Sequence, residues 1–89
     1  MSEINVEAEA EVPDSKFNEL VSYAEGLSTK VRVYCLRKRN DVNKRQEFGN
    51  DLVWFVAVWD GSWIGPSNYY LHRTSKATAL YAALKAFKI

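Results

Sequence analysis

The spacing of apolar residues predicts two helices, one near each end of the chain. The first follows Pro13-Asp14-Ser15, where Asp14 or Ser15 can cap a helix. Its apolar residues recur three or four positions apart, at Phe17, Leu20, Val21, Ala24 and Leu27. The second follows the capping pair Thr74-Ser75, and its apolar residues have the same spacing, at Ala77, Leu80, Tyr81, Leu84 and Phe87.

Between these helices the pattern changes and predicts three strands. Residues 31–36 alternate in the period of two that is typical of a strand. Residues 52–59 form an uninterrupted apolar run, and the Asp60-Gly61 turn that follows indicates a hairpin. The third strand extends over residues 63–72 and is interrupted by a bend at Gly65-Pro66.

The order α-β-β-β-α predicts an α+β fold of one domain. We expect a two-layer sandwich, in which two helices cover one face of a three-stranded antiparallel sheet. The domain comprises residues 13–89, and residues 1–12 form an acidic tail whose alternation of Glu with small apolar residues also suits an edge strand. Residues 37–51 lack apolar periodicity and are expected to form a long loop.

The strand at residues 52–59 is apolar on both of its faces, although helices would cover only one. The second face therefore needs another cover. One alternative is the chain itself, through the tail residues Val6, Ala8 and Val12 or through long side chains of the first strand. The other is a homodimer or a different protein partner, because large exposed apolar patches usually mark interaction sites.

Composition and candidate chemistry favour a non-enzymatic protein. The chain is 47% hydrophobic and 26% charged, as in packed globular domains, and it has no apolar run long enough for a membrane span and no secretory leader pattern. We therefore expect a cytoplasmic protein with no membrane partner. Cys35 and His72 are the single Cys and His, so no disulfide, metal site or cofactor is expected. His72 beside Ser67, Ser75 or Cys35 forms no recognisable catalytic motif, and no catalytic residue is assigned.

The net charge of +1 conceals a strong asymmetry along the chain. Residues 1–25 carry seven acidic residues against Lys16 alone, whereas five basic residues lie within residues 37–45. We predict that this basic loop binds an acidic protein partner, with three aromatic residues as apolar anchors. The predicted partner-binding residues are Arg37, Lys38, Arg39, Lys44, Arg45, Trp54, Trp59 and Tyr70.

The alternative is a small RNA- or DNA-binding module that uses the same loop at residues 37–45. Basic side chains would then contact phosphates while exposed aromatic rings stack on bases. The near-neutral net charge and the absence of a Lys/Arg-Gly-aromatic signature favour the protein partner instead.

Two families resemble parts of this chain. The α-β-β-β-α order that closes with Arg73-Thr74-Ser75-Lys76-Ala77 resembles the double-stranded RNA-binding domain, whose second helix opens with a Ser-Lys-Lys-x-Ala-Lys type sequence. This resemblance implies RNA phosphate contacts at Lys76, the one lysine of the family's pair that is present here.

Roughly the last forty residues are similar to small tailed-phage αβα-sandwich (NinX-like) proteins. The similarity rests on the aromatic strand at residues 54–58, the turn at residues 60–63 and the closing helix at residues 77–86, Ala-Thr-Ala-Leu-Tyr-Ala-Ala-Leu-Lys-Ala. It implies a phage-encoded accessory protein in the bacterial host cytoplasm. Such a protein would bind and modulate a host or phage protein, for example a defence or nucleic-acid enzyme, without catalysis of its own.

Overall fold

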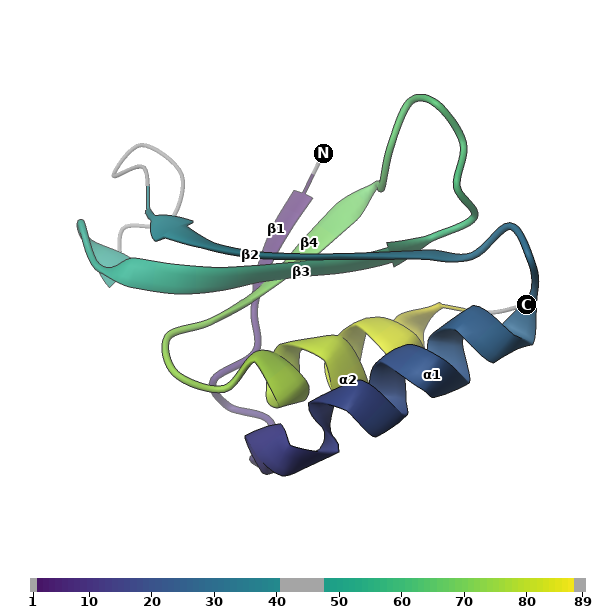
Figure 1. Ribbon diagram of the computed structural model, residues 1–89. Coiled ribbons are helices and arrows are strands. Elements are labelled where there is room, and N and C mark those ends of the chain that lie inside the picture. The colour runs from purple at the N-terminus through teal and green to yellow at the C-terminus, as the bar shows by residue number, and fades with distance from the viewer. Residues whose placement is uncertain (1, 41–47, 88–89) are drawn as a thin grey trace.

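The computed structural model describes residues 2–40 and 48–87, and it confirms the α+β class. Figure 1 shows both helices on one face of a single sheet. In chain order the elements are β1 (Ser2–Asn5), the 3-10 turn η1 (Asp14–Lys16), α1 (Phe17–Leu27), β2 (Arg32–Arg39), β3 (Leu52–Trp59), β4 (Asn68–His72) and α2 (Lys76–Ala86). No helix in these two ranges is long and apolar enough to cross a membrane.

The sheet has four strands and is mixed. The three predicted strands pair antiparallel as expected, but the prediction that they make up the whole sheet is wrong, because a fourth strand pairs in parallel at one edge. Its order is β1-β4-β3-β2, with β1 parallel to β4 and the other neighbours antiparallel. The additional strand comes from the acidic segment at the N-terminus. A parallel partner more than sixty residues away leaves no turn signal, so local patterns give no indication of this pairing.

The rest of the acidic segment packs onto the domain beyond β1. Val6 is buried and donates its backbone N–H to the carbonyl of Leu71 at 3.0 Å. Further along, Glu7 pairs with Arg73 and Glu9 pairs with Lys85. Residues 2–12 thus contribute an edge strand, a core side chain and two ion pairs to the domain.

The main core lies between the helices and the sheet. Alternate strand residues point toward the helices, and the cross-strand row of Cys35, Val56 and Tyr70 belongs to this face. On α2, Leu80 is fully buried, and small residues at Ala79, Ala82 and Ala83 are also buried. These small side chains let α2 approach the sheet closely.

The second face of the sheet is covered by the chain's own aromatic residues. Tyr34 and Tyr69 meet edge to face, with ring centroids 5.5 Å apart, on the two strands that flank Ala57. Phe48, from the segment before β3, is buried in the same cluster as Phe55. The expected cover by tail residues is wrong, because Val6 packs on the helix side, whereas cover by a long side chain of the first predicted strand is confirmed at Tyr34.

The turn after β3 is held against the loop that connects α1 to β2. Gly61 has φ 80°, a conformation that suits glycine, and a Cβ atom there would clash with the carbonyl oxygen of Lys30. Gly65 in the same loop has φ 84°, but open space surrounds the position of its missing Cβ. A side chain at Gly65 would therefore meet backbone strain alone, whereas a side chain at Gly61 would meet both strain and a steric clash.

We predict that Gly61→Ala destabilises the fold more than Gly65→Ala. Both substitutions place alanine at positive φ, at a cost of about 1–2 kcal/mol, but only Gly61→Ala also forces two backbone segments apart, which adds about 1–3 kcal/mol. Denaturant unfolding of the two variants measures this difference. Equal losses of unfolding free energy would show that the close approach to Lys30 contributes nothing.

Candidate partner-binding surfaces

Three of the predicted basic residues lie on one outer edge of the sheet. The predicted loop is wrong at Arg37, Lys38 and Arg39, which extend β2 because they pair with Trp54, Val53 and Leu52 of β3. All three are exposed, and we call this surface the basic edge. Among the strands that the structure describes, β2 pairs only with β3, so its other side is open. The predicted site residues Lys44 and Arg45 lie outside the described residues.

The predicted anchor Trp54 lies beside the basic edge, with its ring in contact with two cations. Arg37 is its cross-strand neighbour, and the guanidinium carbon lies 5.5 Å from the ring centroid. The Lys76 ammonium lies 5.1 Å from the same ring and 4.6 Å from that of Phe17. Cation–π contacts of this kind hold the two basic side chains over Trp54.

The other two cations of the basic edge are also held by contacts within the domain. Lys38 points to the opposite face of the sheet, where its ammonium lies 4.7 Å from the Phe55 ring centroid. Arg39 donates to the carbonyl of Asn50 at 2.8 Å. Positive charge is thereby presented on both faces of β2.

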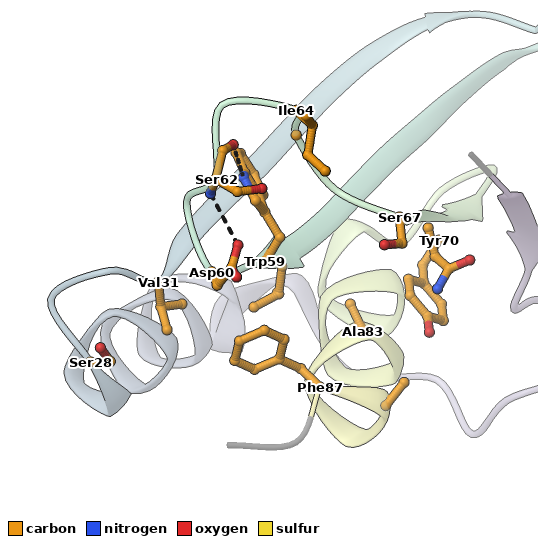
Figure 2. Close-up of a pocket in the computed structure, with 14 residues that line it drawn as sticks. Ser28, Val31, Trp59, Asp60, Ser62, Ile64, Ser67, Tyr70, Ala83 and Phe87 are labelled. Carbon is orange, nitrogen blue, oxygen red and sulfur yellow. Dashed lines mark hydrogen bonds between the residues drawn. The ribbon is translucent and has the colours of Figure 1, made fainter.

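The predicted anchors Trp59 and Tyr70 lie elsewhere, in a cleft of about 520 Å³ between the β3–β4 loop and the C-terminal half of α2. Figure 2 shows Trp59, Tyr70 and Phe87 around this hollow, which we call the aromatic cleft. Asp60 is the one charged residue among those that line it. Burial raises the pKa of Tyr70 above its ordinary value, which keeps the phenol neutral.

The structure thus separates the predicted site into two surfaces. Trp54 and Trp59 stand five residues apart in β3, a separation of about 17 Å along an extended strand. Sequence patterns gave Trp63, Ile64 and Phe87 no binding role. The expected strand over residues 63–72 is wrong at its start, because β4 begins only at Asn68 and leaves Trp63 and Ile64 in the loop before it. Trp63 and Ile64 follow the turn glycine Gly61 and are 95% and 67% exposed. Two large apolar residues within a turn rich in Gly, Ser and Pro are the sequence signal that could have indicated a binding role.

His72 and Ser75, which the sequence offers as candidate catalytic groups, form hydrogen bonds at the start of α2. The His72 Nδ1 accepts backbone N–H bonds from Thr74 at 3.1 Å and from Ser75 at 2.8 Å. The Ser75 hydroxyl accepts from the Thr78 N–H and contacts the Thr78 hydroxyl at 2.7 Å. Both side chains are buried, and their polar atoms are engaged in capping the helix.

Cys35 lies on the helix-facing side of β2, within the main core. Burial raises the pKa of its thiol, although the nearby Lys76 charge acts in the opposite direction. The thiol therefore stays protonated well above neutral pH and is a weak nucleophile there. Across residues 2–40 and 48–87, no three His, Cys, Asp or Glu side chains gather into a group that could hold a metal ion.

In comparisons with known proteins, no protein-family model, curated protein or solved structure matches the chain. The two surfaces are therefore interpreted from their own geometry and chemistry.

We predict that Ser75→Ala lowers the unfolding free energy by about 1–2 kcal/mol, because it removes the cap of the Thr78 N–H in a buried setting. Ser67→Ala is the matched control, since Ser67 is exposed and follows the buried Pro66. Thermal and denaturant unfolding compare the two variants. If both lose the same stability, the hydroxyl of Ser75 does not stabilise α2.

Proposed function

We propose that this protein is a non-enzymatic binding module that takes up an extended, acidic segment of a protein partner along the outer side of β2. The observation that carries the proposal is an eight-residue edge strand ending in three consecutive exposed cations. An added strand would gain main-chain hydrogen bonds along this edge. The side chains of β2 would determine which segments bind.

The alternation of side chains along β2 explains why an acidic segment fits. Arg37 lies on the helix side of the sheet and Lys38 on the other side. Successive acidic residues of an added strand also point to alternate faces, so each would meet a cation on its own face. Leu36 is 44% exposed beside these cations and offers an apolar contact to the same segment.

The acidic N-terminal segment is held away from the basic edge. β1 forms the opposite edge of the sheet, with β4 and β3 between it and β2. Glu7 lies 3.1 Å from Arg73, and Glu9 lies 3.2 Å from Lys85. These contacts support the proposal because the segment does not screen Arg37, Lys38 and Arg39.

The resemblance to tailed-phage accessory proteins makes a host or phage protein the natural partner, in the cytoplasm of the bacterial host. The alternative partner, a single-stranded RNA or DNA, would use the same cations through its phosphates. The two partners would bind through different groups of β2. A protein segment would pair with its main chain, whereas a nucleic acid would contact only its basic side chains.

The proposal is tested by titrating the full chain with a decapeptide of repeating Glu-Glu-Val-Val, which presents Glu on both faces of an added strand, and recording amide chemical shifts and hydrogen exchange. We expect shifts and slower exchange along β2, and Arg37→Glu should weaken binding about tenfold or more. Lys30→Glu is the matched control, because it changes the net charge equally at an exposed residue before β2 begins.

Two further ligands discriminate between the partner classes. The same decapeptide with Lys in place of each Glu should leave the β2 amides unshifted. Tighter binding of a twelve-nucleotide oligothymidylate than of the acidic decapeptide, with a steep loss in salt, would reject the protein partner in favour of a nucleic acid.

A further inference from the structure

The loop after β3 displays a tryptophan that the domain itself does not bury. Trp63 is 95% exposed and its neighbour Ile64 is 67% exposed. Large apolar side chains that stand together on a surface usually mark an interaction site. Aromatic residues of this kind are also the commonest anchors of protein interfaces.

This loop is fixed by hydrogen bonds within and beside it. The Ser62 N–H donates to the Asp60 side chain at 3.0 Å, and the Gly65 N–H donates to the Ser62 carbonyl at 3.0 Å. The Trp59 indole N–H donates to the same carbonyl at 3.3 Å, as Figure 2 shows. A preorganised loop loses little conformational entropy when Trp63 is buried in an interface.

The aromatic cleft lies directly beside this tryptophan. Ser62, Ile64 and Gly65, which flank Trp63 in sequence, are among the residues that line the cleft. Its volume of about 520 Å³ is within the range of about 300–1,000 Å³ that accommodates ligands larger than an indole. Trp59, Tyr70 and Phe87 supply apolar walls, and the Asp60 carboxylate can accept an indole N–H.

We propose that the occupant is a second copy of this chain, with Trp63 of each copy inserted into the aromatic cleft of the other. A projecting side chain and a receiving cleft on one patch are self-complementary, so a two-fold axis can satisfy both contacts at once. Residues 61–72 contain no Asp, Glu, Lys or Arg, although charged residues make up 26% of the chain. Among the described residues that line the cleft, Asp60 is the one that carries a charge. Like charges are therefore few where two copies would meet, and the centres of protein interfaces are depleted in charge in the same way.

Sedimentation equilibrium of the full chain, from micromolar to millimolar concentration, tests this dimer. We expect a reversible dimer whose dissociation constant rises at least about tenfold in Trp63→Ala. The variant should remain folded, because the side chain it removes is exposed. Tyr23→Ala is the matched control, since Tyr23 is an aromatic residue on α1 with 62% exposure and should leave the dimer unchanged.

A second variant distinguishes insertion into the cleft from stacking of one Trp63 on another. Ala86 is exposed and lines the cleft, so Ala86→Phe should fill the receiving side and weaken the dimer while leaving Trp63 in place. Circular dichroism confirms that each variant is folded. A chain that is monomeric up to millimolar concentration overturns the proposal, as does a dimer that tolerates either Trp63→Ala or Ala86→Phe.

Discussion

The buried polar contacts at the start of α2 hold the two halves of the chain together. The Ser75 hydroxyl donates to the Val12 carbonyl at 2.9 Å, and the Val12 N–H donates to the Thr78 hydroxyl at 2.8 Å. Asp14 accepts the Ala77 N–H at 3.2 Å, which joins the turn before α1 to the first turn of α2. Buried polar groups must keep partners, since each one left unpaired costs about 1–3 kcal/mol. These contacts therefore join the start of α2 to the segment before α1, and the N–H bonds of Thr74 and Ser75 to the His72 Nδ1 join it to the end of β4.

The elements that depend on local sequence signals were predicted, whereas the strand pairing between distant segments was not. The helix at α1 matches its apolar spacing, and the apolar run before Asp60-Gly61 forms β3. Residues 1–12 suited an edge strand as well as a tail, but the strand that β1 pairs with was missed, because its parallel pairing with β4 joins residues more than sixty positions apart and leaves no turn between them. The cover of the second face was likewise unpredictable in part, since Phe48 lies in a stretch without periodicity.

For the candidate site too, local sequence signals were informative, whereas the contacts between distant residues could not be predicted. Clustered charge correctly predicted that Arg37, Lys38 and Arg39 lie close together, because neighbouring residues cannot lie far apart. It did not predict that they extend β2, whose alternation puts Arg37 and Lys38 on opposite faces of the sheet. The aromatic anchors were divided between two surfaces, since Trp54 and Trp59 occupy opposite ends of the same strand. Tyr70 joins Trp59 through the fold, which places the ends of β3 and β4 beside α2. Exposure of Trp63 depends on the conformation of its loop, which residue type alone does not specify.

The basic edge and the aromatic cleft lie toward opposite ends of β3 and differ in their chemistry. Cations on an edge strand oppose pairing with the same strand of another copy, because like charges would face each other. The proposed dimer would therefore form through the surface around Trp63, where Asp60 is the one charged residue in the part of the cleft lining that the structure describes, and it would leave β2 to the proposed acidic segment. A dimer formed through Trp63 would present two basic edges, and a partner with two acidic segments would bind both with higher avidity than one.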